Sequence, residues 1–190
     1  MNNTSKLKLP LNEDKWMLVI NSFWAMVTYR EFLKLAQKYP LKQTFFQVVA
    51  LAFQNDLLTK ICNVAELCAE LAEKYDVGTD AVKVAEELGA LCKPAGRTQP
   101  SQNCNVQEFR DFAVCHPILQ KKELRGNKVK MSLEWPTVDK TINKIKEFIQ
   151  TAEDHLGRTA CLSFSTDGEV LNAEAVYLEV SLGLEDGAKY

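Results

Sequence analysis

The sequence predicts an all-α protein, an antiparallel bundle of about five helices with a small C-terminal extension. Apolar residues recur every three or four positions in successive segments up to residue 156. Proline, glycine and polar loops separate these segments, and the apolar pattern changes to alternation only in the tail. We therefore expect a helical bundle domain over residues 11–156 and an extension over residues 157–190.

The first two helices are expected to be long. One covers residues 11–39, with Asn12 as a candidate N-cap, and the other covers residues 41–75. Gly78 follows the second helix, where glycine can adopt the left-handed conformation that ends helices. The apolar stripes behind these predictions are Trp16, Ile20, Phe23 and Val27, then Phe45, Val49, Phe53, Leu57, Ile61, Val64, Leu67 and Leu71. Each stripe marks the helix face that is expected to pack into the core.

Shorter elements follow in the middle of the chain. A third helix is expected over residues 79–91, and residues 93–104 form a loop rich in proline, glycine and polar side chains. Asn105 can cap a fourth helix, because Glu108 stands at its third position and can reach back to the cap. Pro117 disfavours α geometry at the residue before it, so the fourth helix is expected to end there.

The last long helix is expected to begin at Pro136 and to end near residue 156. Beyond it, alternating apolar residues at 160–164 and 176–182 flank a turn at 166–168, which favours a β-hairpin. A further helix through residues 173–180 is the alternative. The helical stripe consists of Val138, Ile142, Ile145, Ile149 and Ala152.

Composition narrows the function classes. A net charge of −2 gives no overall basic field, so a nucleic-acid site must be local. The six cysteines form no Cys-x-x-Cys pair and the chain has two histidines, so we expect neither a metal nor a cofactor. Reduced thiols, a polar N-terminus and the lack of a membrane-spanning apolar run predict a cytoplasmic protein without membrane contact.

Arg110, Asp111 and His116 are the candidate catalytic residues. Arg110 carries a permanently charged, planar fork for phosphate, and His116 can exchange protons near neutral pH. Asp111 is expected to fix the orientation of Arg110 or to polarise the site. This set suits cleavage of RNA by its own 2′-hydroxyl, which needs a base, an acid and positive charge on the transition state.

The spacing of Arg110 and His116 predicts a homodimer. On a straight helix, residues six apart are separated by ~9 Å along the axis and ~120° around it, so the two side chains do not converge. Pro117 can redirect His116, or a two-fold dimer can bring the residues of two chains together. A dimer also supplies two histidines, one as base and one as acid.

A basic segment follows the candidate catalytic residues and is expected to bind the RNA backbone. A solvated loop is the alternative interpretation of the same charges. The candidate RNA-binding residues are Lys121, Lys122, Arg125, Lys128 and Lys130.

The motif resembles that of the HEPN superfamily: an arginine (Arg110), a polar residue directly after it (Asp111), and a histidine (His116) at a helix end. The layout is most similar to the abortive-infection toxin branch, in which the last helix begins near a tryptophan, here Trp135. The resemblance covers residues 11–156. It implies a metal-independent RNA endonuclease that acts as a homodimer in a toxin or phage-defence system, with an antitoxin protein as a candidate partner.

One position departs from some toxins of this family. They carry a tyrosine two residues after the motif histidine, which a partner nucleotidyltransferase modifies, whereas this chain has Ile118. We therefore expect no such regulation. The alternative function is a non-catalytic helical module for dimerisation or for binding a nucleotide or another ligand, in which Arg110 and Asp111 are surface charges of an amphipathic helix.

Overall fold

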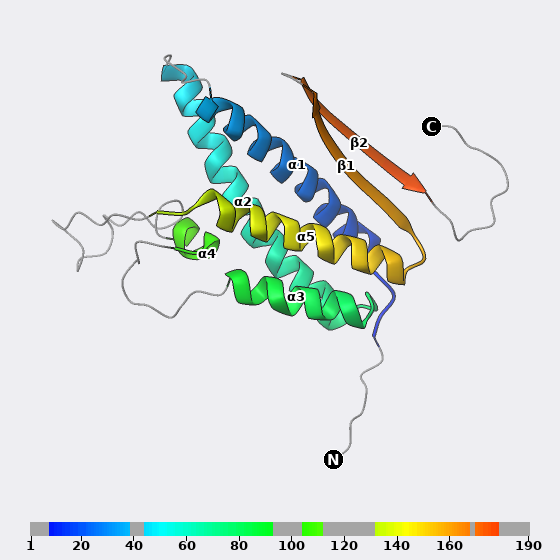
Figure 1. The fold of residues 1–190 in the computed structure, drawn as a ribbon. Coiled ribbons are helices and arrows are strands. Elements are labelled where there is room, and N and C mark those ends of the chain that lie inside the picture. The colour runs from blue at the N-terminus through cyan, green and yellow to red at the C-terminus, as the bar shows by residue number, and fades with distance from the viewer. Residues whose placement is uncertain (1–7, 39–43, 93–103, 112–131, 168–169, 179–190) are drawn as a thin grey trace, which may run out of the picture.

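The all-α class is confirmed by a computed structural model, which describes residues 8–38, 44–92, 104–111, 132–167 and 170–178. A bundle of helices forms the body, and a two-stranded hairpin follows it (Figure 1). The helices of the described residues are α1 (Glu13–Lys38), α2 (Thr44–Lys74), α3 (Thr79–Cys92), α4 (Val106–Phe109) and α5 (Trp135–His155), and the strands are β1 (Thr159–Asp167) and β2 (Val170–Leu178).

The core lies between the four long helices. α1 packs along α2, and α3 packs against both α2 and α5 (Figure 1). The expected stripe of α5 is confirmed, since Val138, Ile142, Ile145, Ile149 and Ala152 are all buried. Short α4 lies against α2 and α3, at the end of the bundle where α5 begins. This position places the start of the predicted motif outside the central core.

The expected helix ends at Asn12 and Gly78 are confirmed. The Asn12 side-chain oxygen accepts the backbone N–H of Lys15 at 3.0 Å, which caps the start of α1. Gly78 has a φ of 85°, the left-handed conformation expected after α2. Leu9 forms a parallel bridge with Tyr75, which ties the segment before α1 to the end of α2.

The C-terminal segment forms an antiparallel hairpin in the structure, not the alternative helix. β1 and β2 pair along their whole length, with Thr159 opposite Leu178 and Asp167 opposite Val170. β2 therefore begins six residues before the alternating pattern at 176–182 that predicted it. The backbone explains the difference, because a short connection after β1 brings the next residues directly alongside it whatever their side chains. Residues 179–182 lie outside the described residues.

No helix within the described ranges is both long and apolar enough to cross a membrane.

Candidate functional site

A short capped helix leads to the arginine of the predicted motif. The Asn105 side chain accepts the backbone N–H of Glu108 at 2.8 Å, and the Glu108 carboxylate accepts the backbone N–H of Asn105 at 3.2 Å. This capping box was expected from the sequence. The backbone N–H of Cys104 also bonds to the carbonyl of Ser132 at 3.0 Å, so α4 is tied to the segment that leads into α5. The capping box and the bond to Ser132 together hold the backbone that leads to Arg110.

Asp111 pairs with Arg110, as expected from the sequence. Nε–H of Arg110 donates to Oδ1 of Asp111 at 2.9 Å, and Nη2 lies 2.8 Å from the same oxygen. The Arg110 side chain is 14% exposed and that of Asp111 is 35% exposed. A guanidinium held in this way keeps one orientation at the edge of the core, which is what a phosphate clamp needs.

Two buried cysteines lie within the electrostatic reach of Arg110. Burial raises the pKa of Cys62 to about 12 and that of Cys92 to about 11, and the nearby Arg110 guanidinium offsets only part of this rise. Both side chains are therefore neutral thiols at physiological pH. A thiol in this state is a poor nucleophile, so neither is a candidate for cysteine-dependent hydrolysis.

An open hollow of about 560 Å³ lies between α2 and α3 on one side of α4. Two carboxylates, Glu66 and Glu86, line it, and they would repel an RNA backbone. The full lining is Cys62, Ala65, Glu66, Ala69, Glu86, Gly89, Ala90, Cys92 and Gln107. A phosphate chain is therefore disfavoured on the α3 side of α4.

The other predicted site residues are not placed by the structure. His116 and the candidate RNA-binding residues lie outside the described residues. The second histidine, His155, is exposed at the end of α5, and its Nε2 lies 3.1 Å from Asp76. Among the described residues, no group of three or more histidine, cysteine or acidic side chains is arranged to hold a metal ion.

A second candidate region was not predicted from the sequence. It lies at the start of α5, where Arg30 of α1 forms a two-point ion pair with Asp139 at 2.6 Å and 2.9 Å. The Arg30 guanidinium also stands over the ring of Trp135, with its carbon 4.0 Å from the ring centroid. One signal was available, because Arg30 occupies a position in the buried stripe of α1 between Met26 and Leu33.

Two adjoining hollows of about 140 Å³ and 480 Å³ open beside Trp135. Gln37 of α1, Gln54 of α2 and Trp135 line both of them, and we call the combined space the glutamine cleft. Its remaining lining residues are Leu57, Leu58, Phe109, Leu133 and Val138 in the smaller hollow, and Leu33, Ala36, Gln47, Ala50 and Leu51 in the larger. Sequence patterns did not point to it, because its residues come from four different helices and the segment before α5.

Comparisons of the chain with protein-family models, with curated proteins and with solved structures find no match. The resemblance to the HEPN superfamily therefore rests on Arg110, Asp111, His116 and the helical layout alone.

Proposed function

We propose that the protein is a metal-independent RNA endonuclease of a toxin or phage-defence type, with Arg110 and His116 of two chains forming a composite site. The observation that carries the proposal is the ion pair between Arg110 and Asp111 at the end of a capped helix. It gives a cation of fixed orientation, 14% exposed, at the position where the motif requires one.

The proposed reaction is attack of the ribose 2′-oxygen on the neighbouring phosphorus. One His116 accepts the proton of the 2′-hydroxyl, and the partner's His116 donates a proton to the leaving 5′-oxygen as its bond to phosphorus breaks. The products are a 2′,3′-cyclic phosphate and a free 5′-hydroxyl. Arg110 binds the phosphate oxygens, whose negative charge grows in the transition state.

A non-catalytic ligand-binding module is the second candidate function. The glutamine cleft favours it, because this cleft combines a fixed aromatic side chain with neutral hydrogen-bonding groups. Such a cleft can bind a ligand whether or not Arg110 takes part in chemistry. The two functions are therefore separable by variants at Arg110 and at the cleft.

The test of the nuclease is RNA cleavage with a chelator present. We expect His116→Ala to lower the rate by roughly 10²–10⁴-fold, the usual contribution of a general acid or base. Arg110→Ala should cause a comparable loss, and Arg110→Lys should restore little, because lysine has no planar fork.

Matched controls are His155→Ala and Arg158→Ala, which remove the other histidine and another ion-paired arginine. Both should cleave at the wild-type rate. Sedimentation of the wild type should show a dimer at the concentration of the assay. An inactive wild type, cleavage unaffected by the changes at Arg110 and His116, or full activity as a monomer would each contradict the proposal.

A further inference from the structure

The glutamine cleft has an uncharged lining. All thirteen side chains around its two hollows are apolar, aromatic or glutamine. A phosphate or a carboxylate would gain no ion pair there, and a cation would find no counter-charge. The cleft therefore suits a neutral group that offers both apolar surface and hydrogen bonds.

The two glutamines shared by both hollows, Gln37 and Gln54, can form hydrogen bonds with a ligand. Neither Gln37 nor Gln54 makes a side-chain hydrogen bond within the part of the chain that the structure describes. Gln54 is half-buried on α2 and lines both hollows, so it stands where the two adjoin. A glutamine amide carries two N–H donors and an acceptor oxygen, which can pair with the polar edge of a flat heterocycle.

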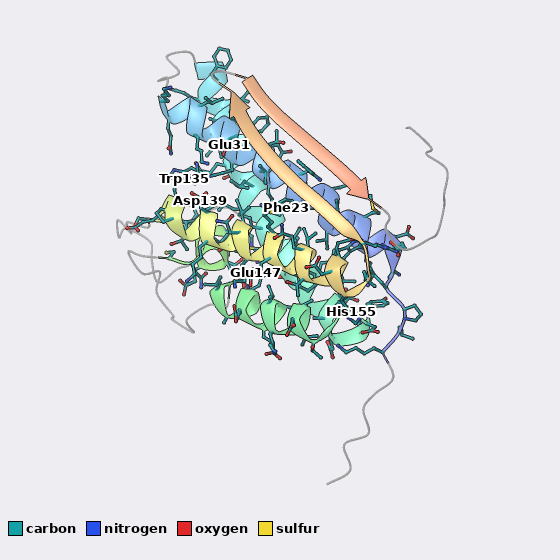
Figure 2. All side chains as sticks on the ribbon, turned by 45° about the vertical axis from the view of Figure 1, so that its right-hand side comes forward. Phe23, Glu31, Trp135, Asp139, Glu147 and His155 are labelled. Atoms are coloured by element: carbon teal, nitrogen blue, oxygen red, sulfur yellow. The ribbon has the colours of Figure 1, made fainter. Side chains whose placement is uncertain are left out.

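The aromatic side chain of the cleft, Trp135, is held in place by Arg30. Arg30 is 7% exposed and stands over the Trp135 ring, and Asp139 binds Arg30 at two points. Figure 2 shows Trp135 and Asp139 at the first turns of α5, on the side that faces α1. A fixed ring loses little freedom when a ligand stacks on it, so binding costs less entropy.

We propose that the glutamine cleft binds a nucleobase, with Trp135 as the stacking surface and Gln54 as the main hydrogen-bonding group. Bases are neutral, planar and edged with donors and acceptors, which matches the lining in each respect. Aliphatic side chains such as Leu57 and Val138 line the smaller hollow and would contact the apolar surface of the base that Trp135 does not cover.

The end of α4 connects the glutamine cleft to the candidate catalytic arginine. Phe109 lines the smaller hollow, and Arg110 is the next residue. Gln107 of α4 lines the other hollow, together with the carboxylates Glu66 of α2 and Glu86 of α3, and these charges disfavour a phosphate chain there. In this respect the inference rests on the proposed function, because it makes RNA the source of the base.

The experiment uses the full chain with 5-fluorotryptophan at its three tryptophans, followed by ¹⁹F NMR. Single Trp→Phe variants assign the signals. The probes are the four nucleosides, a short single-stranded RNA of mixed sequence, and the same RNA with abasic positions. RNA is added to the His116→Ala chain so that cleavage does not consume it.

We expect a saturable shift of the Trp135 signal with at least one nucleoside or with the intact RNA, while the signals of buried Trp16 and of Trp24 stay in place. Gln54→Leu should weaken binding by about tenfold, the value of one good base contact. The matched control Gln150→Leu removes an exposed glutamine of α5 outside the cleft and should leave binding unchanged. Saturation by nucleosides indicates a free nucleotide ligand, and saturation by intact RNA alone indicates a base within a strand.

The inference would be overturned by no Trp135 shift with any probe, by an equal shift with abasic RNA, or by equal binding of the probe to Gln54→Leu and wild type. A Trp135 shift that follows protein concentration alone would also overturn it and would assign the cleft to a second copy of the chain. A failure of the nuclease proposal can be told apart from a failure of this inference, because a chain that does not cleave RNA can still show the Trp135 shift.

Discussion

The two ends of α5 differ in how completely their polar groups are paired. At the C-terminal end, the Trp16 indole N–H donates to buried Glu153, His155 contacts Asp76, and Arg158 pairs with Glu13. At the N-terminal end, Arg30 pairs with Asp139 but its Nη1 is buried without a hydrogen-bond partner among the described residues. The glutamine cleft opens beside that arginine, because Trp135 both lines the cleft and contacts Arg30.

We propose that this difference separates an end that stabilises the fold from an end that binds a ligand. A buried N–H without a partner costs about 1–3 kcal/mol of folding free energy, so a protein gains nothing in stability from leaving one there. Open hollows lined by amides that make no hydrogen bonds are typical of ligand sites, because a bound ligand can supply the missing partners. We therefore expect loss of the tryptophan at the C-terminal end of α5 to change stability more than loss of the tryptophan at the N-terminal end, where substitutions in the cleft should change binding.

The largest expected effect comes from exchanging one tryptophan at each end. Trp16 is 2% exposed and packs 6.1 Å from Phe148 between ring centroids. Trp16→Ala should lower the free energy of unfolding by about 3–5 kcal/mol, since it leaves a cavity and removes the donor of buried Glu153. Trp135→Ala removes a half-buried ring and a cation–π contact, and should cost only about 1–2 kcal/mol.

Urea unfolding followed by circular dichroism measures both tryptophan variants with one signal that does not depend on indole fluorescence. Equal costs at the two positions, or a larger cost at Trp135, would contradict this prediction. Either result would show that the N-terminal end of α5 (the open end) contributes at least as much to stability as the C-terminal end (the closed end).

The next effect tests whether Arg30 is held for stability. Asp139→Ala removes both hydrogen bonds to a guanidinium that is almost fully buried, while Asp139 itself is 37% exposed. Loss of charged hydrogen bonds of this kind should lower the free energy of unfolding by about 2–3 kcal/mol. The matched control is Glu87→Ala, which breaks an exposed ion pair with Lys144 and should leave the unfolding curve unchanged. A silent Asp139→Ala would mean that Arg30 finds another partner.

A smaller effect is expected at Gly78, beneath the C-terminal end of α5. A Cβ on this residue would lie 2.6 Å from Cγ of His155, and its φ of 85° disfavours any L side chain. Gly78→Ala should therefore cost about 1–2 kcal/mol, from backbone strain and from the contact together. In the double variant with His155→Ala, the contact contribution disappears and only the strain remains. Additive costs in thermal unfolding would show that the two residues do not touch in solution.

Local signals predicted the helices well, because each depends on residues close in the chain. The stripe of α5, the Asn12 and Asn105 caps and the left-handed Gly78 all follow from spacing or from one residue's conformational range. Strand β2 was misplaced for a related reason, since its start is set by pairing with β1 rather than by its own pattern.

The candidate sites depend on contacts between distant residues, which spacing does not reveal. Arg30 and Asp139 are 109 positions apart, and Gln37 meets Gln54 and Trp135 only after three helices have packed. The sequence indicated Arg110 and its partner Asp111 because they are neighbours in the chain. The convergence of Arg110 and His116 requires tertiary or quaternary contacts, so it stays a prediction.

The smallest expected effect is a pH dependence that has opposite signs at two carboxyls of the closed end. Burial raises the pKa of Glu153, although the Trp16 indole donates to it. A raised folded-state pKa means that ionisation costs stability, so this cost appears as the pH rises from the ordinary glutamate range through the folded-state value. Glu153→Gln keeps an acceptor for Trp16, and its stability relative to wild type should increase between pH 4 and pH 7, by less than about 1 kcal/mol.

Glu13 supplies the opposite case, because its hydrogen bond with Arg158 lowers its pKa. Its contribution is present above the ordinary glutamate range and is lost as the pH falls through the folded-state value, so Glu13→Gln should lose stability at pH 7 and not at low pH. Urea titrations at both pH values compare the two variants. If Glu153→Gln instead lost stability on going from pH 4 to pH 7, the Glu153 carboxylate would be a stabilising partner of Trp16 and Arg158. The closed end would then owe its stability to charge pairing as well as to burial.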